Sequence, residues 1–287
     1  MKIQKSFKKD QIFGTLYLVP TPIGNLQDMT FRAVSTLKEV DYICAEDTRN
    51  TGILLKHFGI ETRQLSFHEH NAFDKIPQLI AYLKEGKSLA QVSDAGMPSI
   101  SDPGHDLVKA AIAEDISVVA LPGASAGITA LIASGLVPQP HIFYGFLPRK
   151  VGQKLEFLQD KKNYPETQIF YESPHRVSDT LRHIKDVYGD RQVVLVRELT
   201  KYYEEYQRGT ISELKEVIDQ APLKGECLLI VEGYLADKQV VLEDLDLFSL
   251  VEAEVEQGLK PNQAIKKVAK TYHINRQEVY NAYHGLD

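Results

Sequence analysis

Short apolar runs alternate with amphipathic stretches along the first half of the chain. The runs predict buried strands, and apolar residues at helical spacing predict the segments between them. Strands are expected at 14–19, 41–45, 89–92 and 117–121, with a short extended piece near Leu65. Helices are expected from about Asp28 or Thr30, from Thr48, over 76–83, over 105–114 and from Ser125. Strand–helix alternation of this kind is typical of a parallel sheet.

Four of the loops that follow these strands are polar and rich in glycine or proline. They span residues 20–25, 46–49, 93–98 and 122–125. Loops after parallel strands leave the sheet at the same carboxyl edge, where open α/β folds bind their ligands. We therefore expect these four segments to meet in space.

The stretch 90–104 carries the strongest functional signal. Ser93 and Asp94 are polar where the preceding strand should continue, and Gly96 permits a positive φ and a close approach of a ligand. Asp102 is predicted to cap the next helix. An ordinary strand-to-helix turn would need only about three or four residues, so the pattern favours a ligand-binding loop.

A second unit follows the break at 138–140. Its expected strands are 142–146, 168–171, 193–197, a short pair near 206–210, and 227–232, with helices between them. Residues 234–242 resemble a linker, and the last segment reads as three short helices in a helix-turn-helix layout. The predicted fold is therefore α/β, with two α/β domains and a small helical segment. The expected boundaries are a basic tail 1–13, domains 14–122 and 123–235, and helices 240–287.

Composition and charge narrow the class of protein. The net charge of −6 over 287 residues argues mildly against a protein that simply coats nucleic acid. Residues 257–287 nevertheless carry five bases against two acids, which fits either a phosphate-contacting module or a solvated helix face. Cys44 and Cys227 lie in apolar runs and are expected to be buried free thiols, as in a reducing cytoplasm. We expect neither a signal peptide nor a membrane span.

Several common chemistries lack their motifs. No two glycines are spaced as G-x-G, and no P-loop occurs, so NAD and ATP are poor candidates. No G-x-S-x-G marks a catalytic serine. His68, Glu69 and His70 could form half of a metal site, but no cysteine lies near and no H-E-x-x-H occurs, so no metal is predicted.

The remaining picture is an edge pocket with acidic side chains. Glu46, Asp47 and Asp94 would line it, with glycine-loop backbone and little fixed positive charge except Arg49. Such a pocket suits a cationic ligand with hydroxyl groups better than a polyphosphate. S-adenosylmethionine (SAM) has a sulfonium, an ammonium and a ribose diol, and it fits this description.

Six motifs in order carry a resemblance over residues 14–233. They are 20–26 (PTPIGNL), 46–49 (EDTR), 68–71 (HEHN), 93–98 (SDAGMP) with 101–104 (SDPG), 172–176 (ESPHR) and 197–201 (RELTK). The chain resembles the SAM-dependent tetrapyrrole-methylase superfamily of class III methyltransferases. It is most similar to the ribosomal RNA small subunit methyltransferase I family, which methylates a cytidine 2′-oxygen in the decoding region of 16S rRNA.

The resemblance implies SAM as cofactor in a cleft between the two domains, a homodimer, and no membrane partner. Carried over position by position, it predicts a set of cofactor contacts. These are Pro20, Asp94, Ala95, Gly96, Pro98, Ile100, Ser125, Ala126, Tyr171, Cys227 and Leu228. The tetrapyrrole methylases have an acid where this chain has Met97, so Asp94 is the expected carboxylate.

The other motifs are expected to serve the RNA, either naked or in the assembled subunit. The predicted contacts are Arg49, His175, Arg176, Arg197 and Lys201 near the cleft, and Lys266, Lys267 and Lys270 in the terminal helices. The alternative for the cleft bases is interdomain or dimer salt bridges, and His175 could be a solvated loop residue.

The expected reaction is direct transfer of the sulfonium methyl group to a ribose 2′-oxygen. Alignment of the reactants can supply roughly 7–11 kcal/mol. A general base would help, and Glu46, Asp47 and Glu198 are the candidates by motif, with no choice among them and none required. The rival functions are a tetrapyrrole C-methyltransferase and a non-catalytic RNA-binding assembly factor.

Overall fold

The computed structural model describes residues 1–5, 12–100, 102–221, 223–235, 246–272 and 274–285. Parts of the expected tail and linker, and Ser101 of the 101–104 motif, lie outside these residues. The chain forms two compact units, 1–162 with 166–232 and 163–165 with 233–287. Within the described part, no helix has the length and apolar character needed to cross a membrane.

The first sheet has five strands in the order β3-β2-β4-β1-β5, and every neighbouring pair is parallel. Its strands are β1 (Thr15–Leu18), β2 (Tyr42–Ala45), β3 (Gln64–Ser66), β4 (Leu89–Val92) and β5 (Ser117–Ala120). The predicted parallel sheet is confirmed. Because β1 and β4 lie in the middle, the loops that follow them reach the centre of the carboxyl edge.

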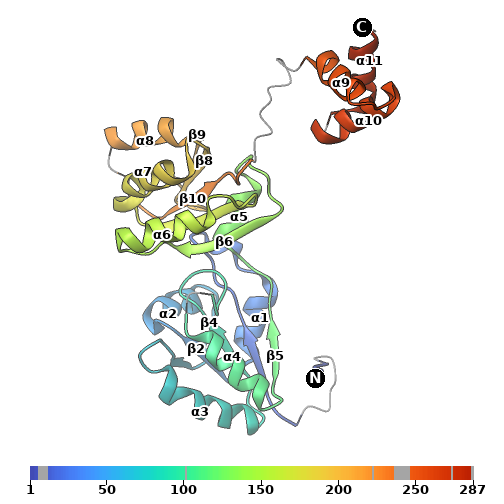
Figure 1. Cartoon of the computed structure of the whole chain (residues 1–287). Helices are drawn as coiled ribbons and strands as arrows, with labels where there is room; N and C mark the ends of the chain where they lie inside the picture. Colours follow the sequence, from blue (N-terminus) through green and yellow to red (C-terminus); the bar gives the residue numbers. More distant parts are fainter. Residues whose placement is uncertain (6–11, 101, 222, 236–245, 273, 286–287) are drawn as a thin grey trace. The chain divides into compact units, whose positions relative to one another are not determined.

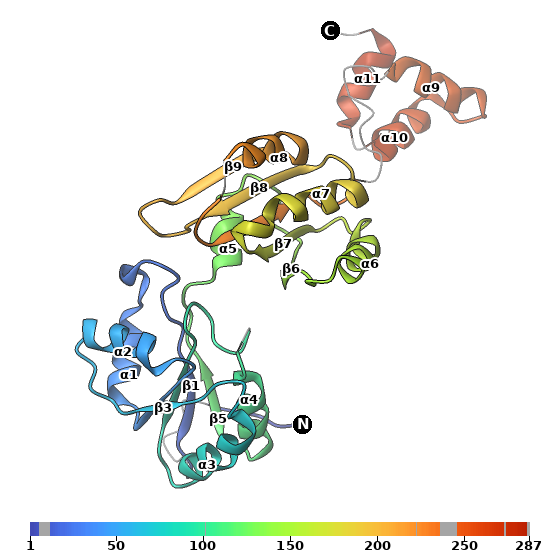
Figure 2. The same cartoon turned by 90° about the vertical axis from the view of Figure 1, so that its left-hand side faces the viewer.

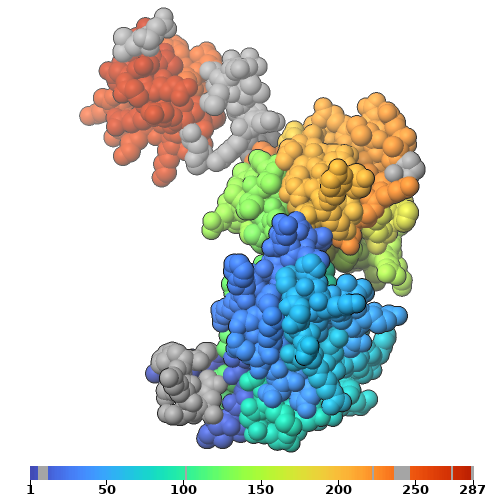
Figure 3. All heavy atoms as spheres, turned by 180° about the vertical axis from the view of Figure 1, so that it is seen from behind, coloured from blue at the N-terminus to red at the C-terminus, as the bar shows by residue number. Residues whose placement is uncertain are grey.

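Helices cover both faces of this sheet (Figures 1 and 2). They are α1 (Phe31–Glu39) and α2 (Thr48–His57) on one face, and α3 (Ala72–Lys84) and α4 (Gly104–Ala113) on the other. The alternation of side chains along a strand explains the two cores, since Leu89 faces α3 and α4 while Ala90 faces α1. Figure 3 shows this N-terminal region from behind as spheres, coloured blue to cyan.

The starts of two helices differ by one residue from expectation. The N-cap of α2 is Asp47, whose Oδ1 accepts the Arg49 N–H at 2.8 Å, so Thr48 is the first helical residue and not the cap. Pro103 takes the N-cap position of α4, while Asp102 accepts the Gly104 N–H at 2.8 Å from one residue earlier. In both cases a carboxylate satisfies a free N–H of the first turn.

The second sheet is mixed, with the order β6-β7-β10-β8-β9. Its strands are β6 (His141–Phe146), β7 (Thr167–Glu172), β8 (Gln192–Arg197), β9 (Glu205–Thr210) and β10 (Cys227–Val231). Only β6 and β7 pair in parallel, and the other three pairs are antiparallel. The short pair expected near 206–210 is the single strand β9.

This second sheet is also covered on both faces. The helices α6 (Val151–Lys161), α7 (Val177–Tyr188) and α8 (Ile211–Gln220) pack on one face, and α5 (Ala126–Ile132) packs on the other. Phe170 and Leu229 face the three helices, whereas Ile169 and Leu228 face α5. The face that carries α5 is the one that contributes to the cavity described below.

The unit that ends the chain contains three helices among its described residues. They are α9 (Leu247–Glu256), α10 (Pro261–Tyr272) and α11 (Arg276–His284), and they share a core around Val251, Ile265 and Val279. Asn275 caps α11, because its Oδ1 accepts the Gln277 N–H at 2.9 Å. The expected three short helices are confirmed, while the domain boundaries stay predictions.

Candidate active site

The loops after β1 and β4 are joined directly. Thr21 and Gly96 form an isolated antiparallel bridge with two N–H···O bonds of 3.0 Å, and the Thr21 hydroxyl donates to the Ser93 carbonyl at 3.0 Å. Gly96 has a φ of +77°, which favours glycine at this position. The backbone of 93–96 is therefore held against the end of β1.

The loop after β5 packs on the same place. A Cβ added at Gly123 would lie 2.5 Å from the Cβ of Pro20, and a Cβ at Gly96 would lie 3.4 Å from the Ala124 carbonyl oxygen. These contacts leave no room for a side chain at Gly123. Glycine is thus required by the close approach of the β1 and β5 loops.

Asp94 connects the remaining loop, 46–49, to the other three by hydrogen bonds. Its Oδ1 accepts the backbone N–H of Asp47 at 3.2 Å, and its Oδ2 accepts the side-chain amide of Asn50 at 3.2 Å. The four loops expected to meet at the carboxyl edge do so, which confirms the prediction drawn from strand order. Asp94 also acts as an anion at the start of α2, which the helix dipole favours.

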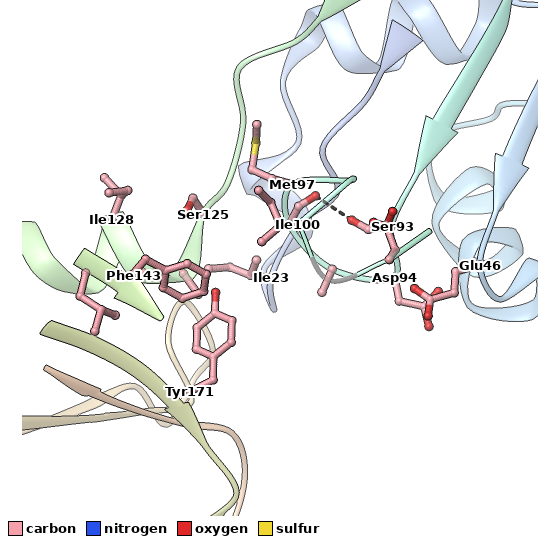
Figure 4. Close-up of a pocket in the computed structure, with 16 residues that line it drawn as sticks. Ile23, Glu46, Ser93, Asp94, Met97, Ile100, Ser125, Ile128, Phe143 and Tyr171 are labelled. Atoms are coloured by element: carbon pink, nitrogen blue, oxygen red, sulfur yellow. Dashed lines mark hydrogen bonds between the residues drawn. The ribbon is translucent and has the colours of Figure 1, made fainter. Parts of the chain in front are cut away.

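A cavity of about 340 Å³ lies at this edge, within the range of small-molecule sites. Figure 4 shows Glu46 and Asp94 side by side at one end of it, and Phe143 and Tyr171 at the other. It is lined by Ile23, Glu46, Ser93, Asp94, Ala95, Gly96, Met97, Ile100, Asp102, Ser125, Ala126, Gly127, Ile128, Phe143, Ile169 and Tyr171. Both sheets therefore contribute to one site.

The electrostatic character of the cavity is acidic. The described lining residues include three carboxylates, Glu46, Asp94 and Asp102, and no lysine, arginine or histidine. Burial raises the pKa of the Glu46 carboxyl above its ordinary value, and the neighbouring Asp94 and Asp102 carboxylates raise it further. A ligand with positive charge would relieve this repulsion, whereas a polyphosphate would increase it.

Asp102 has a structural task as well. Its carboxylate accepts the N–H groups of Ser99 and Gly104 and the side-chain amide of Gln91, at 2.8–3.0 Å. Ser99 has a φ of +70°, a conformation that is strained for a residue with a side chain. Asp102 thus fixes the turn that closes one wall of the cavity.

Seven of the residues expected to contact the cofactor line this cavity. They are Asp94, Ala95, Gly96, Ile100, Ser125, Ala126 and Tyr171. Pro20 and Pro98 are buried and are not among the lining residues, and Leu228 faces α5 without reaching the lining. Cys227 lies on the opposite face of the sheet among α7 and α8, as a buried free thiol. The structure therefore does not bring these four residues into the cavity.

Sequence reasoning missed several lining residues. Ile23, Asp102, Gly127, Ile128, Phe143 and Ile169 were not assigned to the site. Ile169 could have been found, because it shares a strand face with Tyr171 two residues later. No signal in the sequence marked Phe143, whose ring packs edge-on against Tyr171 with centroids 4.9 Å apart.

The three candidate bases have different surroundings. Glu46 lines the cavity. Two hydrogen bonds from Arg49 lower the pKa of Asp47 to about 2, and its carboxylate is occupied by them. Glu198 accepts hydrogen bonds from the Glu226 N–H at 2.9 Å and from the Lys201 ammonium at 3.1 Å, and both lower its pKa. Only Glu46 combines access to the cavity with a raised proton affinity.

The bases expected to meet RNA near the cleft are dispersed. Arg49 is exposed, His175 is exposed, and Lys201 is paired with Glu198 and Glu226 while its stem packs on Gly24. Arg197 binds Glu205 at 2.6 Å and pairs in register with Cys227. It therefore lies on the α8 face of the second sheet, away from the cavity, and its ion pair joins the neighbouring strands β8 and β9, so it is neither the interdomain nor the dimer salt bridge given as the alternative.

Arg176 lines a separate cavity at the ends of β6 and β7. In the terminal unit, Lys266, Lys267 and Lys270 are all exposed on α10, opposite its buried Ile265 and Val268. Lys267 is paired with Glu254 at 2.6 Å.

The described residues contain no group of three or more acidic, histidine or cysteine side chains arranged to hold a metal ion. His68 instead faces Asn71, with its Nε2 at 3.2 Å from the side-chain amide nitrogen. The electrostatic effect of nearby His68 opposes the rise in the pKa of Glu46, but the net shift remains upward. His68 thus lies near the Glu46 end of the site.

Comparison with solved structures shows the fold. A cobalt precorrin-4 methyltransferase matches with a TM-score of 0.58 and 16% identity, over 76% of this chain and 94% of that one. A diphthine synthase matches with a TM-score of 0.57 and 12% identity, over 77% and 90% of the two chains. At these identities the likeness concerns the fold alone.

Sequence comparison shows the family. The model of the tetrapyrrole (corrin/porphyrin) methylases matches residues 15–215. A "Ribosomal RNA small subunit methyltransferase I" of Streptococcus pyogenes serotype M1 is 71% identical over all of both chains, and one of Bacillus subtilis (strain 168) is 48% identical over 99% of both. The chain belongs to the tetrapyrrole methylase family and, within it, to the ribosomal RNA small subunit methyltransferase I family.

Proposed function

We propose that this protein transfers a methyl group from SAM to the ribose 2′-hydroxyl of a cytidine in the decoding region of small-subunit ribosomal RNA. The observation that carries the proposal is the composition of the cavity, which joins an acidic end to an aromatic end at the carboxyl edge. The names of full-length relatives support ribosomal RNA of the small subunit as the substrate.

The residues of the cavity fit SAM. Its acidic end, Glu46 and Asp94, suits positive charge and hydroxyl groups, and its apolar walls suit an adenine ring. The Gly96 and Ser125 loops also line the cavity, and the Gly96 N–H and carbonyl are already bonded to Thr21. When bound, SAM supplies a methyl group already activated by the sulfonium, so the protein's task is to align the reactants.

Glu46 is the side chain best placed to act on the 2′-hydroxyl. Its carboxyl has a raised pKa and lines the cavity, so it can accept the proton that the hydroxyl loses. Asp47 and Glu198 are held by cations and serve as anchors for Arg49 and Lys201. A general base of this kind contributes typically 10²–10⁴-fold to a rate.

Partners follow from the same proposal. The substrate is the ribosomal RNA or the assembled small subunit in the cytoplasm, and the protein acts as a homodimer. The exposed lysines of α10 add contacts to RNA phosphates, since the terminal unit has its own core and an uninterrupted polar helix face.

Two acceptors offered in parallel test the proposal. SAM with a labelled methyl group is incubated with the protein and either small ribosomal subunits lacking the modification or uroporphyrinogen. Label is expected in the ribosomal RNA only. Label in the tetrapyrrole would assign a C-methyltransferase, and calorimetric SAM binding without transfer to either would assign a non-catalytic factor.

A further inference from the structure

A second cavity lies at the carboxyl ends of the only parallel strand pair in the second sheet. It measures about 580 Å³ and is lined by Phe146, Leu147, Arg149, Glu172, Ser173 and Arg176. Phe146 ends β6 and Glu172 ends β7, so this is again an edge at which α/β sheets bind ligands.

The wall of this cavity contains a buried ionic cluster. The side chain of Glu172 has no exposed surface, and its oxygens accept the Ser173 N–H at 2.9 Å and the Thr180 hydroxyl at 2.7 Å. The Arg176 Nε lies 3.4 Å from the same carboxylate. Buried Lys154 donates to the Thr180 hydroxyl at 2.8 Å and lies 4.0 Å from Glu172.

This cluster has an excess of positive charge. Lys154 and Arg176 share the single carboxylate of Glu172, and exposed Arg149 forms no ion pair among the described residues. Desolvation without full neutralisation is costly for a cation, and burial lowers the pKa of Lys154 accordingly. An anion in the cavity would supply the missing negative charge.

An aromatic side chain borders the same cavity. Phe146 is 64% exposed, and its ring centroid lies 5.5 Å from that of Tyr171, which lines the acidic cavity. The two cavities therefore adjoin across this ring pair. Single-stranded RNA is commonly recognised by stacking of an unstacked base on such a ring and by cations on the phosphate.

We propose that this cavity binds the nucleotide next to the one that is methylated, with its phosphate at Arg149 and Arg176 and its base on Phe146. Glu172 is the positioning residue that holds Arg176. The inference rests on the proposed function, because an RNA strand must enter the acidic cavity for its neighbour to reach Phe146.

The test measures equilibrium binding of the full chain to unmodified small-subunit RNA over a range of salt concentrations, so it does not depend on methyl transfer. Arg149→Ala is expected to reduce the slope of log K against log salt by about 0.7, the value of one single-strand phosphate contact. Phe146→Ala is expected to weaken binding by roughly tenfold with an unchanged slope, since stacking is uncharged.

Arg182→Ala is the matched control, because Arg182 is an exposed arginine paired with Asp179 outside the cavity. It should keep the wild-type affinity and slope, and all three variants should bind SAM normally in calorimetry. Wild-type RNA affinity and slope in both Arg149→Ala and Phe146→Ala would overturn the subsite. Failure of the wild type to methylate any RNA, with the two variant effects intact, would instead reject the proposed function alone.

Discussion

The carboxylate of Asp94 accepts the backbone N–H of Asp47 at 3.2 Å, and this bond connects the loop after β4 to the start of α2. Asp94 is also an exposed member of the acidic cavity. Asp94 thus has two roles, because it holds two loops together and it contributes negative charge to the cavity.

Replacement of Asp94 should reduce cofactor affinity. In Asp94→Ala the cavity loses a carboxylate and α2 loses its acceptor, so we expect SAM binding in calorimetry to weaken by at least about tenfold, or about 1.4 kcal/mol. Asp106→Ala, an exposed acid in the first turn of α4, is the control and should bind SAM as the wild type does. Normal SAM binding by Asp94→Ala would show that the cofactor lies elsewhere.

The contact between Gly123 and Pro20 should be equally sensitive. A methyl group at Gly123 would lie 2.5 Å from the Pro20 Cβ, so Gly123→Ala must separate the β1 and β5 loops. We expect a loss of about 1–3 kcal/mol in the free energy of unfolding and weaker SAM binding. Gly152→Ala, where a Cβ meets nothing within 4 Å, should change stability by less than about 1 kcal/mol. Equal behaviour of the two variants in urea denaturation would contradict the loop packing.

The pH dependence of the rate should report Glu46. A base is active when deprotonated, and the pKa of Glu46 is raised, so the rate should increase with pH through a value above that of an ordinary glutamate. Glu46→Gln should lower kcat by roughly 10²–10⁴-fold and lose this acidic limb, while calorimetric SAM binding should weaken less than in Asp94→Ala. Asp47→Asn should retain the limb, because the Asp47 pKa of about 2 lies far below it. An unchanged pH–rate profile in Glu46→Gln would show that Glu46 is not the general base.

The ionic cluster behind the second cavity should be costly to break. In Glu172→Gln, buried Lys154 and half-buried Arg176 lose their shared carboxylate, and we expect the free energy of unfolding to fall by about 3–5 kcal/mol. Adding Lys154→Met should recover part of this loss, because it removes the uncompensated buried cation. Urea denaturation of the two single variants and the double variant measures the coupling, and strict additivity would argue against a shared cluster.

Much of this structure follows from local sequence pattern. Strand and helix positions were predictable because apolar periodicity is a direct consequence of burial, and the convergence of the loops at 20–25, 46–49, 93–98 and 122–125 follows from parallel strand order alone. The seven expected cofactor contacts that line the cavity came from the family resemblance, which carries positional information that periodicity cannot show.

In the second sheet, the differences from expectation come from non-local pairing. β10 inserts between β7 and β8 although it is last in sequence, so the second sheet is mixed and its order is invisible to local pattern. Arg197 shares a strand face with Val193 and Leu195, but no sequence signal says that this face packs on α8 and not on the cavity. The same pairing places Cys227 on the face that packs on α7 and α8, away from the cavity.

The terminal helices should contribute to RNA affinity and not to cofactor binding. Because residues 246–285 contain a separate core, deletion of 240–287 should leave calorimetric SAM binding unchanged. Binding to small-subunit RNA should weaken, and its salt dependence should become flatter by about 0.7–0.9 for each phosphate that the shortened chain no longer neutralises. The paired variant Lys266→Ala with Lys270→Ala should reproduce the flatter slope. A wild-type slope in the shortened protein would show that these helices neutralise no RNA phosphates.

The most direct test of the central claim is the position of the methyl group in the product. Small-subunit RNA from a strain lacking the protein, treated with the purified protein and SAM, is digested and analysed by mass spectrometry beside an untreated sample. We predict one additional methyl group, on the ribose of a single cytidine in the decoding region, which appears with the wild type and not with Glu46→Gln. A methyl group on a base, or an unmodified RNA in the presence of SAM-bound protein, would contradict the proposed reaction.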